Sequence, residues 1–239
     1  MDQVFIQLIA LQEVDLRIHT LEQSKIDFPR MVTQLTTVIE AAEAEKSAAQ
    51  KKVDAVLADE KAIQDKITDY TALLEKSQSR LNSIKTNREY DAIHAEIENA
   101  KSGTVSGAAK LKHVEAEKER LMAVLQEVAA KTDAARADNE PQIAELTEKI
   151  AAIDSQIAEI VKERDVITPS IPRPYLAQYD FIRLRRKNGR ALSVVSESRN
   201  CGNCFKILES HFINEVKAGR KLINCQSCGS ILVWQSQST

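Results

Sequence analysis

The sequence predicts a mainly α-helical protein, with a long antiparallel coiled-coil hairpin followed by a small C-terminal domain that contains four cysteines. Three observations support this fold class. Apolar residues recur with a heptad spacing, glycine and proline together number 11 of 239 residues, and all cysteines lie between positions 201 and 228. So few turn residues, with 4% aromatic residues, exclude a β-sandwich or barrel. The first glycine is Gly103, which excludes an early glycine-rich phosphate loop.

The first arm of the hairpin is marked by a heptad stripe. Alternate steps of four and three from Phe28 to Ile84 define 17 positions, and 14 of them are apolar when Ala and Tyr are counted. A repeat of this kind is typical of a left-handed coiled coil, because it keeps one seam facing a partner helix. The polar exceptions are Lys46, Glu60 and Ser77.

The second arm carries two further stripes. One runs from Ile143 to Ile167 and is interrupted only by Arg164, and a weaker one runs from Leu111 to Val128. Two strong stripes in one chain predict that the two helical segments pair with each other as a hairpin.

The apex of the hairpin has two candidate positions. At 82–88, Thr86 followed three residues later by Glu89 fits a capping box that would start a new helix. At 102–107, Gly103 and Gly107 form the only glycine pair of the helical region. An apex near 84 makes the two arms equally long, about 120 Å each for about 80 residues, so we prefer 82–88.

Prolines mark three places along the chain. Because proline suits the first position of a helix, we expect a kink near Pro29, with the preceding 27 residues forming a separate helix or a kinked segment. Pro141 predicts a local kink in the second arm. Three prolines between 169 and 174 cannot continue a helix. We therefore place the hairpin domain at 1–168 and a second domain at 169–239.

The second domain is predicted to be a short helix and a zinc ribbon. Residues 175–187 fit a helix that ends at Asn188-Gly189. Short apolar runs predict four strands, at 191–196, 205–208, 221–224 and 231–234.

The cysteines carry the strongest chemical signal. Cys201 and Cys204 form one Cys-x-x-Cys pair, and Cys225 and Cys228 form a second pair after an interval of twenty residues. Two tight turns of this kind present four thiolates to one ion, which leaves no position for water or substrate. We expect one structural Zn²⁺, with rubredoxin-like iron, a redox dithiol or disulfides as alternatives. Metal binding would also supply folding energy to a domain too small to bury a large core, and His211 is not needed as a ligand.

Charge is divided unevenly between the two parts of the chain. Residues 1–166 carry 22 Lys and Arg against 31 Asp and Glu, a balance of −9, whereas 167–239 carry 11 against 4, a balance of +7. The basic end is a candidate nucleic-acid contact, because its cations lie beside Tyr175, Tyr179 and Phe181. The alternative interpretation is that these cations have a structural role: they stabilise the C-terminus of a helix, or they contact the acidic hairpin. The candidate contacts are Arg183, Arg185, Arg186, Lys187 and Arg190.

Several functional classes are not expected. The chain has no Gly-x-Ser-x-Gly, His-Glu-x-x-His or Walker motif, so we expect neither an enzyme nor a small-molecule substrate. No apolar run approaches the length of a membrane span, and the N-terminus lacks the basic region of a signal peptide. With cysteines grouped as a metal site, these features predict a cytoplasmic protein without membrane insertion.

The combination of these motifs resembles a family of bacterial proteins with an N-terminal coiled-coil hairpin and a C-terminal four-cysteine zinc ribbon, and it is most similar to the chlamydial member. The resemblance rests on residues 85–97 (Lys-Thr-Asn-Arg-Glu-Tyr-Asp-Ala-Ile-His-Ala-Glu-Ile), on Pro29, on the stretch 179–189 and on the ending that starts at Cys228. The glycine-containing stretch 102–107 departs from the continuous helix of relatives.

The resemblance implies a non-enzymatic adaptor that binds proteins through its coiled coil. Its partners would be the enhancer-dependent alternative sigma factor and components of flagellar or type III secretion export apparatus. Nucleic-acid binding is also implied for some members, so a nucleic-acid-binding regulator that uses the basic segment and the ribbon is the alternative. A purely structural spacer is the third hypothesis. Loss of salt-dependent RNA or DNA binding on neutralising 183–190 would favour the regulator.

Overall fold

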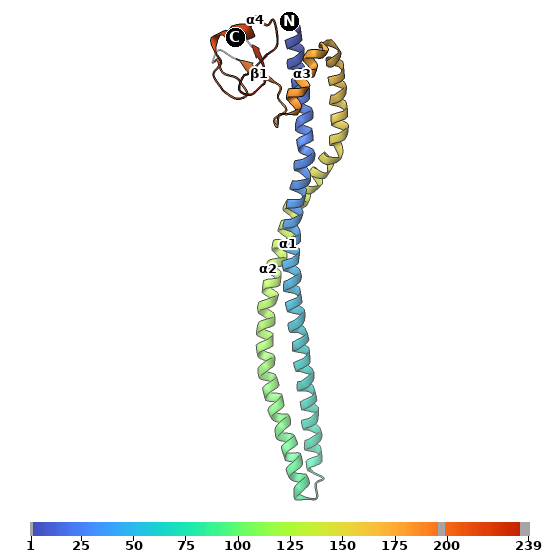
Figure 1. Ribbon diagram of the computed structural model, residues 1–239. Helices are drawn as coiled ribbons and strands as arrows, with labels where there is room; N and C mark the ends of the chain where they lie inside the picture. Colours follow the sequence, from blue (N-terminus) through green and yellow to red (C-terminus); the bar gives the residue numbers. More distant parts are fainter. Residues whose placement is uncertain (1, 196–198, 235–239) are drawn as a thin grey trace. The chain divides into compact units, whose positions relative to one another are not determined.

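The computed structural model describes residues 2–195 and 199–234, and Figure 1 shows their arrangement. Two long helices are followed by a short helical segment and a small three-stranded sheet, so the predicted fold class is confirmed. The helices are α1 (Asp2–Leu81), α2 (Asn87–Ile167), the 3₁₀ turn η1 (Thr168–Ser170), α3 (Arg173–Leu184) and α4 (Ser210–Ala218). The strands are β1 (Leu192–Val195), β2 (Ile223–Asn224) and β3 (Ile231–Trp234).

The chain divides into two compact units. Unit 1 contains Met1–Val32 and Ala144–Thr239, and unit 2 contains Thr33–Ile143. Unit 1 therefore combines the N-terminal part of α1 and the C-terminal part of α2 with α3 and the cysteine-containing domain. Unit 2 is the part of the helix pair that includes the turn. The division into separate domains at residue 168 stays a prediction.

The heptad stripe forms the seam between α1 and α2. Every position of the stripe from Phe28 to Ile84 is buried or half-buried. Each polar exception is matched by a polar residue of α2. The matched pairs are Lys46 with Asp133 at 3.9 Å, Glu60 with Lys118 at 2.6 Å and Ser77 with Glu96 at 3.0 Å. The polar interruptions are therefore cross-helix partners within the seam.

The turn of the hairpin spans residues 82–86, between the end of α1 and the start of α2. The Glu89 backbone N–H donates to Thr86 Oγ1 at 3.3 Å, and Glu89 Oε2 accepts from the Lys85 N–H at 3.3 Å. The hydrogen bond from Lys85 lowers the pKa of Glu89. These contacts satisfy backbone donors that the start of a helix leaves unpaired.

The alternative apex at 102–107 is instead interior to α2. A Cβ atom added to Gly103 would lie 2.7 Å from the Tyr70 ring, and one added to Gly107 would lie 2.6 Å from Ile67 Cγ1. The glycines therefore leave room in the seam for two large side chains of α1, which explains their presence without a turn.

α1 continues through Pro29 as one helix, so residues 1–27 do not form a separate helix, and the kink expected near Pro29 stays a prediction. Pro141 likewise lies inside the continuous α2. A proline removes one backbone hydrogen bond from a helix interior. Seam residues lie close to each proline, with Phe28 and Val32 beside Pro29 and the buried Leu146 after Pro141.

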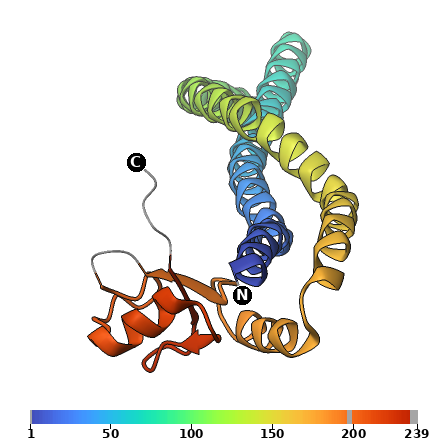
Figure 2. The ribbon, with the colours of Figure 1, turned by 90° about the horizontal axis from the view of Figure 1, so that it is seen from above.

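Within unit 1, α3 lies between the C-terminal end of α2 and the cysteine-containing domain (Figure 2). The sheet has the order β1-β3-β2, with β1 parallel and β2 antiparallel to β3. A buried cluster joins Leu8 and Leu11 of α1 to Tyr179 and Ile182 of α3 and to apolar residues of the sheet. The small sheet thus packs on the first turns of α1.

Several local predictions for this domain need correction. Residues 205–208 form no strand, because Phe205 has a positive φ of 59° and only Ile207 makes an isolated bridge. The helix predicted over 175–187 ends at Leu184, and Gly189 (φ 64°) belongs to the following turn rather than to its cap. α4 was not predicted. Of the strand predicted at 191–196, Ser196 lies outside the described residues.

We expect Gly103→Leu to destabilise unit 2, because its side chain would overpack the Tyr70 ring at a cost of about 1–3 kcal/mol. Thermal unfolding followed by circular dichroism at 222 nm checks this. Ser106→Leu, at an exposed position of the same helix, is the control for helix propensity. Tyr70→Ala should partly rescue Gly103→Leu. Equal melting temperatures for the two leucine variants would contradict this account of the seam.

Candidate metal centre and surrounding surfaces

The four cysteines converge on one point of the C-terminal domain. Cys201 and Cys204 lie in a turn that follows β1, Cys225 directly follows β2, and Cys228 lies in the turn before β3. All four Sγ atoms lie within 4.8 Å of one another. The Sγ atoms of Cys201 and Cys228 are 3.6 Å apart, and those of Cys204 and Cys225 are 3.7 Å apart.

This geometry fits a tetrahedral metal site. Four sulfurs at the Zn–S distance of about 2.3 Å are separated by about 3.8 Å along each tetrahedron edge. A disulfide requires about 2.05 Å, and the cysteines are free thiols. The clustering is therefore consistent with a metal site formed by Cys201, Cys204, Cys225 and Cys228. Sites with four protein ligands are typical of structural metals.

The two cysteine turns have the same backbone conformation and hydrogen bonding. The Phe205 N–H donates to the Cys201 carbonyl at 2.8 Å, and the Gly229 N–H donates to the Cys225 carbonyl at 2.7 Å. Phe205 and Gly229, which directly follow Cys204 and Cys228, both have positive φ, 59° and 72°. The turn therefore requires a left-handed residue after its second cysteine, and in the first turn that residue is a phenylalanine.

Two buried serines support the thiols. Ser193 Oγ lies 3.1 Å from Cys201 Sγ, and Ser230 Oγ lies 3.4 Å from Cys228 Sγ. Asn203 Nδ2 donates to Ser230 Oγ at 2.8 Å and fixes its position. Such hydrogen bonds orient the side chains that would bind a metal. Spacing alone could not identify these residues, because Ser193 reaches the site only through the fold of β1.

The thiols differ in how readily they ionise. Burial raises the pKa of Cys225 to about 12. Burial also acts on Cys228, but hydrogen bonds that involve the Ser230 side chain and backbone and the neighbouring thiols outweigh it and lower the pKa of Cys228 to about 6. A metal ion bound by all four thiolates would have to displace the proton of Cys225.

His211 is remote from this chemistry. Its side chain is largely exposed and its Nδ1 lies 3.3 Å from the Glu209 carboxylate. It does not belong to the group of potential metal ligands found among the described residues.

The structure separates the five candidate nucleic-acid contacts into two groups. Arg183 points inward, with its Nη1 3.3 Å from Asp15 Oδ1, and Arg186 is half-buried. Arg185, Lys187 and Arg190 are exposed. Of the three aromatic residues beside them, Tyr179 is fully buried, and only Phe181 is largely exposed.

A buried ionic network is the reason why Arg183 points inward. Asp15 of α1 is fully buried, and its Oδ1 accepts from Arg164 Nε of α2 at 2.9 Å. Arg164 also donates to Asp180 of α3 at 2.5 Å. Burial, together with the charge of Asp15, raises the pKa of Tyr179 and keeps its hydroxyl neutral. The network joins α1, α2 and α3 within unit 1.

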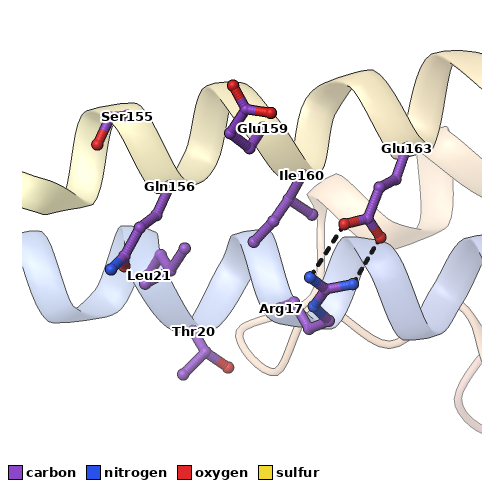
Figure 3. Close-up of a pocket in the computed structure, with 8 residues that line it drawn as sticks. All are labelled: Arg17, Thr20, Leu21, Ser155, Gln156, Glu159, Ile160 and Glu163. Atoms are coloured by element: carbon purple, nitrogen blue, oxygen red, sulfur yellow. Dashed lines mark hydrogen bonds and ion pairs between the residues drawn. The ribbon is translucent and has the colours of Figure 1, made fainter.

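A groove lies between α1 and α2 in unit 1 and has a volume of about 610 Å³ (Figure 3). Leu21 and Ile160 supply its apolar surface. Arg17 and Glu163 form an ion pair at 2.6 Å at one end. The remaining lining residues are Thr20, Ser155, Gln156 and Glu159. The groove combines a narrow apolar strip with a polar rim, and the sequence stripes do not reveal it.

These features define a coiled-coil hairpin protein with a C-terminal four-cysteine cluster. Its fold is similar to that of CT398 from Chlamydia trachomatis, with 16% identity, a TM-score of 0.74 and coverage of 98% of this chain and 100% of that one. It is also similar to HP0958 from Helicobacter pylori, with 18% identity, a TM-score of 0.55 and 98% coverage of both chains. A protein from Mycobacterium smegmatis matches with 16% identity, a TM-score of 0.58 and coverage of 95% and 98%.

The resemblance inferred from the sequence is therefore confirmed at the level of the fold. No family model matches the chain, and no curated protein matches it. Among the described residues, no helix has the length and apolar character that crossing a membrane would require.

We expect the freshly purified protein to contain one zinc ion per chain, measured by elemental analysis. Cys225→Ser should abolish metal binding and unfold the sheet and α4, because the ion supplies folding energy to this small domain. Unit 2 should remain helical, since its seam does not involve the cysteines. Ser227→Ala, in the same turn, is the control and should retain the metal. Two ions per chain, or none, would contradict this site.

We expect Asp15→Asn to destabilise unit 1 by about 3 kcal/mol, because it leaves the arginines of the network without their buried carboxylate. Chemical denaturation measures the loss. Asp165→Asn, at an exposed position near Arg164, should change stability by less than about 0.5 kcal/mol. If the two variants are equally stable, the network does not hold unit 1 together.

Proposed function

We propose that this protein is a non-enzymatic adaptor that binds partner proteins through α1 and α2, while one Zn²⁺ at the four cysteines holds the C-terminal domain in shape. The observation that carries the proposal is the groove of unit 1. The seam between the helices is used internally, whereas the groove presents the half-buried Leu21, over the buried Ile160, beside a polar rim. A groove between two helices is a common binding site for an amphipathic helix.

The partners follow from the resemblance. The shared fold with CT398 and HP0958 supports a role like that implied for the family. The proposed partners are the enhancer-dependent alternative sigma factor and a flagellar or type III secretion export-apparatus protein, bound in the cytoplasm. The acidic balance of residues 1–166 favours partners with basic surfaces and makes association sensitive to salt.

Nucleic-acid binding is a second candidate function, and the cysteine turn favours it. Phe205 and Ile207 are 75% and 77% exposed, and they flank the exposed Lys206. An exposed aromatic ring beside a cation can stack on a base and contact phosphate. The candidate surface therefore lies on the ribbon rather than on the whole segment 183–190.

The groove can be tested in the full-length protein by the double variant Thr20→Arg and Gln156→Arg, which places two long side chains over its exposed rim. We expect this variant to lose binding to the purified alternative sigma factor or export-apparatus protein, measured by titration calorimetry after nuclease treatment. Its helix content should not change, since both positions are exposed.

The matched control is Thr37→Arg with Gln126→Arg, which changes exposed positions of the same helices in unit 2. The control should bind as the unaltered protein does. If neither partner binds after nuclease treatment, or if only Phe205→Ala abolishes binding, the adaptor proposal is wrong and the result supports nucleic-acid binding.

A further inference from the structure

The outer face of α3 differs from an ordinary solvated helix face. The inner face packs Tyr179 and Ile182 into the core of unit 1. On the opposite face, Phe181 is 55% exposed and Leu184 is 75% exposed. Ala177, four residues before Phe181, is also exposed and extends the same stripe. A helix with one buried face normally presents polar residues to water, so this second apolar stripe requires an explanation.

The exposed charged residues of α3 and of the turn that follows it are all positive. Arg173, Arg185, Lys187 and Arg190 are exposed, and no carboxylate among the described residues lies within ion-pair distance of them. Asp180 is the only acidic residue between positions 168 and 195, and it pairs with Arg164 at 2.5 Å. The outer face of α3 therefore presents cations without any compensating acid, and its complement is an anionic partner.

The apolar side chains favour a protein over a nucleic acid as that partner. The Arg185 guanidinium lies 3.7 Å from the centre of the Phe181 ring, so one face of the ring is already covered and is closed to a stacking base. Leu184 is the most exposed residue of the stripe, and an aliphatic side chain gains nothing from a phosphate backbone. Side chains three residues apart on a helix are neighbours, which suits apolar residues repeated along a partner helix.

We propose that the outer face of α3 binds an acidic amphipathic helix of a partner protein. Apolar residues of that helix contact Phe181 and Leu184, and its carboxylates pair with Arg173 and Arg185. This surface is separate from the α1–α2 groove and does not depend on it. An adaptor with both surfaces holds two partners at once, one in the groove and one on α3.

The test uses the full-length protein and a fluorescein-labelled synthetic helical peptide, with Leu at every third or fourth position and Glu at most others. Fluorescence anisotropy should show that the protein binds this peptide and that binding weakens as salt is added. Leu184→Glu should weaken binding about tenfold, through lost apolar contact and charge repulsion. Val105→Glu, an equally exposed apolar position in unit 2, is the control and should bind normally.

Three further measurements separate the competing outcomes. The same peptide with Lys in place of Glu should not bind. Thr20→Arg with Gln156→Arg should bind the acidic peptide normally, so failure of the groove proposal would leave this one intact. Photo-cross-linking from p-benzoylphenylalanine at position 184 in cells should join α3 to a segment rich in acidic and apolar residues, identified by mass spectrometry.

The proposal is overturned if the acidic peptide does not bind, or if Leu184→Glu binds it as well as Val105→Glu does. It is also overturned if the protein does not bind the peptide but binds a single-stranded oligonucleotide or phosphatidylserine vesicles, and if Leu184→Glu weakens that binding. Cross-links to nucleic acid or to basic segments alone would have the same consequence.

Discussion

The contact between the first turns of α1 and the cysteine-containing domain is the constraint on which the fold of unit 1 depends. Leu8 and Leu11 are fully buried there, among residues of α3, β1 and β3. A sheet of three short strands cannot bury enough apolar surface to fold alone. It obtains stability from its packing against a long helix on one side, and the proposed metal would add to this on the other. The N-terminal turns of α1 therefore belong to the core of unit 1.

Polar residues in the seam make the pairing of α1 and α2 specific. A stripe of aliphatic side chains alone would tolerate a shift by one heptad, because each turn offers a similar surface. Glu60 with Lys118, and Ser77 with Glu96, lose their partners after such a shift. Tyr70 also restricts the register, because its ring fits only opposite a residue without a side chain, which is Gly103. These features cost some stability and define one register.

The sequence was sufficient for features that depend on local spacing. The heptad stripe predicted which residues of α1 face α2, and the Cys-x-x-Cys pairs predicted the cluster of thiols. Features that depend on contacts between distant segments could not be predicted from the sequence. The inward direction of Arg183 requires Asp15, which lies 168 positions earlier in the chain. The left-handed Phe205 was missed because residues 205–208, with three apolar side chains, were interpreted as a strand.

The structure also changes the meaning of the uneven charge distribution. Counted along the chain, residues 167–239 form one basic region, but their cations serve different purposes. Arg183 pairs with Asp15 in the buried network, and Lys217 lies over the Trp234 ring at 4.1 Å. What remains on α3 and in the turn after it is a set of exposed cations, Arg173, Arg185, Lys187 and Arg190, of which Arg185 lies over the Phe181 ring. A diffuse positive field would attract any polyanion, whereas cations arranged around an apolar stripe favour a partner with both acidic and apolar residues.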